Sequence, residues 1–183
     1  DMAWTIAPAG LSFALSRFWT LAQAELMRLG PAIPLQDRVG VADFGVPSSQ
    51  PRFHLLDLEA GTASSHLVAH GRGSDPEDSG LLQAFSNEVD SNASSEGAYR
   101  TGEFYVGRYG RSLRLTGLDG SNDNALPRAI VVHGADYVSP AIVHRSGRLG
   151  LSEGCFAFSE DEAEAVMASL GQDRLLLAGR FHG

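Results

Sequence analysis

Residues 128–135 read RAIVVHGA, and the prediction of the fold starts from this stretch. Its central letters IVV form a continuous apolar run, which is typical of a buried strand. His133 stands at the end of the run, and Gly134 follows it. Glycine allows the backbone to turn sharply or to approach another group closely. The stretch therefore predicts a buried strand that ends in an imidazole.

The sequence on either side predicts mostly strands, with one helix near each end of the chain. Apolar residues at spacings of three and four indicate an amphipathic helix over 11–29, ended by Gly30. Ser159 with Glu162 three residues later is a capping-box pattern, and it predicts a second helix that stops at Gly171. Short β-like runs between Gly, Pro and Ser turn signals predict strands at 39–46, 52–59, 63–71, 102–110, 112–118, 128–135 and 174–181.

A polar segment from Gly71 to Gly97 separates two groups of predicted strands. It is too long for a simple turn, which predicts a functional loop or a surface excursion. The DGSNDN stretch at 119–124 lacks the carboxylate spacing of a calcium loop, so we interpret it as a turn. Neither an internal repeat nor a linker divides the sequence. We therefore expect residues 1–183 to form a single, mainly β domain with flanking helices.

Composition narrows the classes of partner. The formal net charge of -8 and the pI near 5.1 argue against nucleic acid or an anionic membrane surface as the main partner. No apolar run approaches the roughly 20 residues that span a bilayer. The chain begins at Asp1 without a basic-then-apolar export segment. Composition by itself does not assign the compartment, and the oligomeric state is not predicted.

The stretch SEGCFAF, residues 152–158, holds the one cysteine of the chain. Cys155 is either a small buried apolar residue or a nucleophile. A nucleophilic thiol needs a base, because its ordinary pKa is about 8.5. His133 lies 22 positions earlier, and the glycines and proline in between allow the chain to fold back. Unhindered N–H groups at Gly154 and Cys155 would face a developing oxyanion. Spacing leaves both interpretations open.

The other histidines offer weaker alternatives. His66 and His70 form an HxxxH pattern, but it lies in a strand-like run, so polar strand-end residues are a better interpretation than a metal pair. His144, which is 11 positions from Cys155, is a rival base whose flanking residues match no motif. We expect no metal site and no cofactor.

RAIVVHGADYVS followed by GRLGLSEGC resembles the HG…SxGC signature of L,D-transpeptidase catalytic domains of the YkuD type. The resemblance extends to their murein L,D-transpeptidase subgroup through FHLLDLEAG, VAHGRGSD, FSNEVDSNASSEGAYRTGEFYVGRYGRSLRLTGLD and NDNALPRAI. It implies a β-sandwich-like catalytic fold, with the catalytic motif at 128–158, acting on peptidoglycan stem peptides in the bacterial envelope.

By position, the resemblance implies that Cys155 is the nucleophile and His133 the general base. It assigns to Gly134 a backbone carbonyl that holds the second ring nitrogen of the histidine. It also assigns the oxyanion-hole amides to Gly154 and Cys155 and matches Ser152 to the serine of the motif.

Further positions follow from the same resemblance. Tyr137 is expected near the substrate, whereas His70 and Asn87 fall in matching segments and are expected to make structural polar contacts.

The sequence departs from the subgroup pattern around the cysteine. Leu151 and Phe156 stand where an arginine and a proline are expected, and Arg148 is then the candidate partner for a substrate carboxylate. Glu153 occupies a position that is often histidine, and we expect its side chain to point to solvent. These departures keep a catalytically silent peptidoglycan-binding domain among the alternatives.

The resemblance predicts cysteine-dependent acyl transfer on stem peptides through a thioester, in an exported protein of the periplasm or cell envelope. Two further alternatives keep the same Cys–His pair. One is an L,D-carboxypeptidase or endopeptidase, and the other is a hydrolase of different amides.

Overall fold

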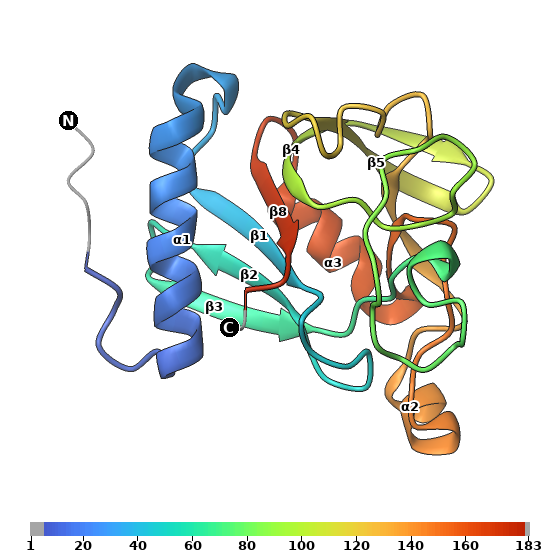
Figure 1. The fold of residues 1–183 in the computed structure, drawn as a ribbon. Coiled ribbons are helices and arrows are strands. Elements are labelled where there is room, and N and C mark those ends of the chain that lie inside the picture. The colour runs from blue at the N-terminus through green and yellow to red at the C-terminus, as the bar shows by residue number, and fades with distance from the viewer. Residues whose placement is uncertain (1–5, 182–183) are drawn as a thin grey trace.

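Eight strands form one mixed sheet in the computed structural model, which describes residues 6–181 (Figure 1). The strand order across the sheet is β3-β2-β1-β8-β4-β5-β6-β7. The pairs β1–β8 and β6–β7 are parallel, and the others are antiparallel. The strands are β1 (Arg38–Asp43), β2 (Phe53–Asp57), β3 (Thr62–His66), β4 (Gly97–Gly107), β5 (Gly110–Gly117), β6 (Val131–Ala135), β7 (Phe156–Ser159) and β8 (Leu175–Gly179).

The sheet curls until the chain beyond one edge meets the other edge. After β3, the Ala69 N–H donates to the carbonyl of Ala157 in β7 at 2.9 Å. The prediction of a mainly β, sandwich-like fold with flanking helices is therefore confirmed.

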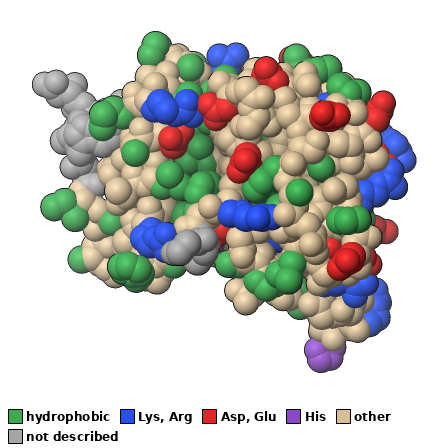
Figure 2. All heavy atoms as spheres, in the orientation of Figure 1, with side chains coloured by type: hydrophobic (Ala, Val, Ile, Leu, Met, Phe, Trp, Pro, Cys, Tyr) green, Lys and Arg blue, Asp and Glu red, His purple; other side chains and the backbone are tan. Residues whose placement is uncertain are grey.

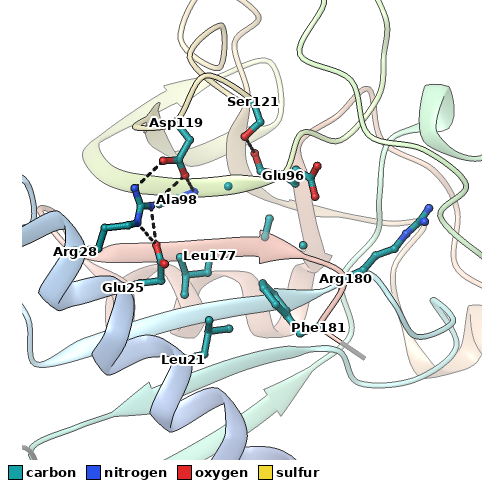
Figure 3. Close-up of a pocket in the computed structure, with 13 residues that line it drawn as sticks. Leu21, Glu25, Arg28, Glu96, Ala98, Asp119, Ser121, Leu177, Arg180 and Phe181 are labelled. Carbon is teal, nitrogen blue, oxygen red and sulfur yellow. Dashed lines mark hydrogen bonds and ion pairs between the residues drawn. The ribbon is translucent and has the colours of Figure 1, made fainter. Parts of the chain in front are cut away.

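Helix α1 (Phe13–Leu29) covers the outer face of β1 and β8, as Figure 1 shows. Ser12 caps the helix, because its Oγ accepts a hydrogen bond from the Leu15 N–H. At the other end, Arg28 lies between Glu25 of the same helix and Asp119 after β5 (Figure 3). The apolar contact joins Phe18, Trp19, Ala22 and Leu26 to Val39, Val41, Leu56, Ala98, Leu175 and Leu177.

Helix α3 (Glu160–Leu170) lies against the inner face of the curled sheet. Ser159 caps it as predicted, since its Oγ accepts the Glu162 N–H at 3.3 Å. Val166, Met167 and Leu170 are buried in the larger apolar core. This core also holds the β7 aromatics and Val132 of β6, so it fixes the strand that carries the HG motif and the strand that follows the SEGC motif.

Two elements were absent from the sequence prediction, namely the strand β7 and the helix α2 (Pro140–Ser146). Four residues are too few to show a strand period. Helix α2 has only seven residues and buries none of them, although Ser139 caps it and Pro140 occupies its first turn. Five predicted strands are also shorter than expected, whereas β4 begins at Gly97 rather than at 102. Two of the shorter strands end early for a clear reason. The strand predicted at 39–46 ends at Asp43, whose carboxylate accepts the Gly45 N–H, and the strand predicted at 63–71 ends at His66 before the chain crosses to β7.

On the face drawn in Figure 2, basic and acidic side chains are interspersed, and neither sign forms a continuous patch. None of the helices in residues 6–181 combines the length and the apolar character that crossing a membrane requires.

Candidate active site

The segment Ser152–Cys155 forms a tight turn just before β7. The Ser152 hydroxyl donates to the Cys155 carbonyl at 2.7 Å and accepts the Gly154 N–H at 3.2 Å. Gly154 has φ +109°, and a Cβ there would lie 2.6 Å from the Ala93 carbonyl oxygen. Both the backbone conformation and the lack of space require glycine. The motif serine and glycine therefore fix the backbone at the cysteine.

The predicted oxyanion amides differ in their contacts. The Gly154 N–H donates to the Ser152 hydroxyl. Outside the β-ladder, the Cys155 N–H makes no hydrogen bond to any residue in 6–181. The Cys155 amide is thus the one of the two that is available to a bound group.

His133 lies in β6 and is almost completely buried, with 1% of its surface exposed. Its Nδ1 lies 2.8 Å from the Gly134 carbonyl oxygen. A carbonyl oxygen can only accept, so Nδ1 carries the proton and Nε2 holds a lone pair. This tautomer is the one a general base requires, and the contact is the one expected of Gly134.

The strand register relates His133 to Cys155. In the parallel pair β6–β7, His133 is opposite Ala157 and Val132 is opposite Phe156. Cys155 is two residues before Ala157, so it shares the sheet face of Ala157 and His133. The fold therefore places the imidazole and the thiol on one face of neighbouring strands.

Tyr109 is a site residue that the sequence did not indicate. It lies in the turn between β4 and β5, and its ring stacks on His133 with centroids 4.2 Å apart and planes 12° from parallel. The ladder explains this placement, because Ser112 of β5 is paired with His133. Tyr109 thus covers one face of the imidazole and restricts its rotation.

Cys155 lines a pocket of about 350 Å³, although only 6% of its surface is exposed. The sulfur is therefore not sealed inside an apolar interior. The residues around it are Val89, Asp90, Asn92, Tyr105, Arg108, Tyr109, Pro127, Arg128, Ala129 and Glu153. This lining is mostly polar and aromatic, which suits a peptide rather than an apolar ligand.

Burial sets the resting protonation of the pair. Burial raises the pKa of the Cys155 thiol to about 11, against the opposing effect of the Val131 N–H. The thiol donates weakly to the Ala129 carbonyl at 3.5 Å. Burial also lowers the pKa of His133. At neutral pH both the Cys155 thiol and the His133 imidazole are therefore neutral.

Arg128 is a second residue that sequence reasoning missed. Its guanidinium donates to the carbonyls of Ser86 and Ala93 and to the Ser91 hydroxyl. It lines the Cys155 pocket, and its positive charge opposes the rise in the thiol pKa. Arg128 is the first residue of the stretch RAIVVHGA, but the neighbouring sequence gives no sign that its side chain binds the segment at 86–93.

The predicted long loop is an ordered wall of the site. Its two ends meet, because a Cβ on Gly71 would lie 2.4 Å from the Asn92 carbonyl oxygen. Asn87 donates to Asp123 at 2.7 Å and accepts the Asn124 N–H, which ties the loop to the turn at 119–124. Asn87 therefore makes the structural contacts expected of it.

His70 belongs to a buried chain of polar groups behind the motif turn. Arg52 donates to its Nδ1 at 2.7 Å, which leaves Nε2 to donate to Asp75 at 3.2 Å. The His70 carbonyl accepts the Ser152 N–H at 2.9 Å. The expected structural role is thus the one its contacts describe, and the role includes holding the turn that carries Cys155.

Several predicted residues lie outside the pocket around Cys155. Arg148 forms a two-pronged ion pair with Asp78, at 2.6 and 2.9 Å, so its guanidinium is already occupied. Tyr137 is partly buried and contacts Gly150, and the negative charge of a Cys155 thiolate adds to the burial that raises its pKa. The rival base His144 is exposed on α2 and does not line this pocket.

The departures from the subgroup motif have structural explanations. Phe156 is buried in the larger core, where its ring meets Tyr99 edge to face at a centroid distance of 5.4 Å. Its side chain points to the face of β7 opposite Cys155, so it shapes the core rather than the pocket. Glu153 is exposed, as predicted, and pairs with Arg72 at 3.3 Å. Nothing in the structure explains the leucine at 151.

Other candidate sites are less suited to chemistry. His66 contacts Glu162 and Ser64, and residues 6–181 contain no group of three potential ligands arranged for a metal ion. A pocket of about 340 Å³ lies between α1 and β8 (Figure 3). The described residues that line it include neither histidine nor cysteine, and its Arg28 is shared between Glu25 and Asp119.

Comparison with solved structures gives mycobacterial L,D-transpeptidases. L,D-transpeptidase 3 from Mycobacterium tuberculosis, in complex with a faropenem-derived adduct, is 17% identical, with a TM-score of 0.50 over 78% of this chain and 60% of that chain. An L,D-transpeptidase from Mycobacterium smegmatis is 15% identical, with a TM-score of 0.47 over 78% of this chain and 58% of that one. The chain thus spans about three fifths of the length of these proteins. No curated protein sequence matches it.

The family model described as the L,D-transpeptidase catalytic domain (YkuD_2) matches residues 17–178. This range includes seven strands, all of β8 but its last residue, the stacked His133 and the turn that holds Cys155. The chain therefore belongs to the L,D-transpeptidase catalytic domain family.

Proposed function

We propose that this domain catalyses L,D-transpeptidation of peptidoglycan stem peptides through a thioester on Cys155. The supporting observation is the arrangement of His133, whose Nδ1–H is held by Gly134 while its Nε2 lone pair lies on the sheet face shared with Cys155. This is the orientation that removes a proton from the thiol.

In the first step, His133 takes the proton of Cys155 as the sulfur attacks the carbonyl carbon that links an L-centre to the terminal D-residue. The oxyanion accepts the Cys155 N–H. The C–N bond then breaks, the leaving nitrogen takes the proton from His133, and a thioester remains on the sulfur. Since the resting pair is neutral, charge develops only as substrate binds and the proton moves.

In the second step, an acceptor amine attacks the thioester carbonyl. His133 removes the amine proton and returns it to the departing sulfur. Water in place of the amine gives the carboxypeptidase outcome, and the same site serves both acceptors. The substrate lies in the cell envelope, so we also propose that the domain acts outside the cytoplasm.

Mass spectrometry of a synthetic stem tetrapeptide, incubated with the protein and an acceptor amine, tests this proposal. We expect a product whose mass equals the peptide plus the acceptor minus the released terminal amino acid. A product that gained only water would replace transpeptidation by hydrolysis. Absence of both products, together with no acyl adduct on Cys155, would favour the silent binding domain.

Cys155→Ala is the decisive variant. We expect it to abolish turnover, because the sulfur forms the covalent bond, and to leave the fold intact, because the change removes a single buried atom. Circular dichroism and the unfolding midpoint check the fold. Turnover by this variant would show that the sulfur is not the nucleophile.

A further inference from the structure

The turn between β4 and β5 brings a cation to the Cys155 pocket. Arg108 precedes Tyr109 in this turn, and its guanidinium carbon lies 5.4 Å from the centroid of the Tyr109 ring. Both residues line the pocket of about 350 Å³. Because Tyr109 stacks on His133, the position of Arg108 relative to the catalytic pair is set by the same turn.

Arg108 differs from the other arginines of this hairpin. Arg100 pairs with Asp173 at 4.0 Å, Arg111 with Glu164 at 3.2 Å, and Arg114 with Glu103 at 3.1 Å. Within the described residues, no carboxylate lies within ion-pair distance of Arg108. The hairpin therefore leaves one exposed guanidinium without an acidic partner, on the pocket that Cys155 also lines.

The remaining charges of the pocket do not satisfy this guanidinium. Glu153 lies beside Arg72, and Asp90, the other lining acid, makes no ion pair with Arg108. Arg128 directs its donors to backbone carbonyls and hydroxyls, which makes it a structural clamp. A planar guanidinium presents paired N–H donors that match a carboxylate.

We propose that Arg108 determines specificity for an acyl donor that carries a free carboxylate beside the bond to be broken. Its guanidinium binds this carboxylate while Cys155 attacks the neighbouring carbonyl. This inference rests on the proposed transpeptidase function and deepens it, since it names the charge of the preferred donor. Arg148, which sequence reasoning proposed for the same task, is occupied by Asp78.

The test compares two synthetic tetrapeptides that differ only in whether the carboxylate of the terminal D-residue is free or amidated. We expect the native protein to favour the free acid. Arg108→Gln should raise KM for the free acid roughly tenfold and abolish the preference for the free acid over the amide. Arg111→Gln is the matched control, because Arg111 belongs to the same hairpin but pairs with Glu164 outside the pocket. It should retain the preference for the acid.

Equal effects of Arg108→Gln on both peptides, or no effect on either, would overturn the role of Arg108. The failure of the proposed function looks different, since the native protein would then turn over neither peptide. In that case, equilibrium binding of the two peptides to Cys155→Ala still decides the inference. A preference for the acid that Arg108→Gln removes would support carboxylate binding, and equal affinities would reject it.

Discussion

At the scale of single residues, the site depends on groups whose chemistry is set by one or two neighbours. The Gly134 carbonyl fixes the tautomer of His133, Tyr109 covers its ring, and Ser152 fixes the backbone at Cys155. None of these neighbours needs to touch the reacting carbonyl to affect the rate. Their effect is to remove alternative positions of the imidazole and the sulfur before substrate arrives.

Gly154→Ala is expected to destabilise the protein by about 1–3 kcal/mol. The new methyl group would meet the Ala93 carbonyl at 2.6 Å, and the residue would keep a φ of +109°. Gly147→Ala is the control, because that glycine also has a positive φ, +71°, but has open space around it. Urea unfolding measures both. Equal losses would show that the backbone around Gly154 yields to a side chain.

The pH profile of turnover follows from the two shifted groups. Burial lowers the pKa of His133 below its ordinary value near 6.5, so the base stays available into mildly acidic solution. Burial raises the pKa of Cys155 to about 11, so no alkaline loss from the thiol is expected near neutrality. We expect kcat/KM to rise with an apparent pKa below 6.5 and then to stay flat to about pH 9. An acid limb centred well above 6.5 would contradict the assignment of the base.

Single residues also show where sequence reasoning stops. The resemblance singled out Cys155 and His133, because the HG and SxGC motifs are local in sequence. Tyr109 and Arg108 could not, because their roles arise from pairing β5 with β6, and no local pattern reports which strands pair. Arg148 was predicted from a gap in the motif, whereas its actual neighbour Asp78 is 70 positions away.

At the scale of elements, both long helices were predictable from apolar spacing and from their caps. Apolar spacing and capping residues are local signals, so the helices that they predict also form in the tertiary structure. Strand β7 and helix α2 were not predicted, because four and seven residues show too little periodicity. The strand β7 nevertheless positions Cys155, since its register with β6 decides which face the sulfur shares with the imidazole.

Ser159→Ala is expected to lower the free energy of unfolding by about 1 kcal/mol. The change removes the oxygen that accepts the Glu162 N–H at the start of α3, next to the end of β7. Ser169→Ala provides the control, because it lies inside the same helix, where alanine is the better helix former. Chemical denaturation should show a loss for the first variant and none for the second. Similar losses in both would place the effect outside the cap.

At the scale of the whole molecule, a buried polar chain links the inner wall to the motif turn. Arg52, His70 and Asp75 are each fully buried, and His70 also supports the backbone of Ser152. Burial, with the nearby charge of Arg52, lowers the pKa of His70 to about 4. The folded protein keeps this imidazole neutral, while the unfolded chain protonates it near pH 6.5. The free energy of unfolding therefore depends on pH through His70, which is remote from the reacting atoms.

The linkage predicts that stability falls as the pH drops from about 6.5 to about 4. Over this range the unfolded state binds a proton that the folded state excludes, which costs about 3 kcal/mol for His70. His70→Gln, which can still accept from Arg52 and donate to Asp75, should have a clearly flatter dependence. Urea unfolding at several pH values measures both proteins. If the free energy of unfolding depended on pH in the same way in both proteins, His70 would not be the source of this dependence.

The central claim is that His133 makes the Cys155 sulfur reactive, and alkylation by neutral iodoacetamide measures this most directly. The chain has one cysteine, so intact mass reports that site without ambiguity. We predict that the alkylation rate of the native protein levels off at an apparent pKa below 6.5, and that at pH 7 His133→Gln is slower by at least about a hundredfold. Equal rates in the two proteins, both rising steadily toward a thiol pKa of about 11, would contradict the account.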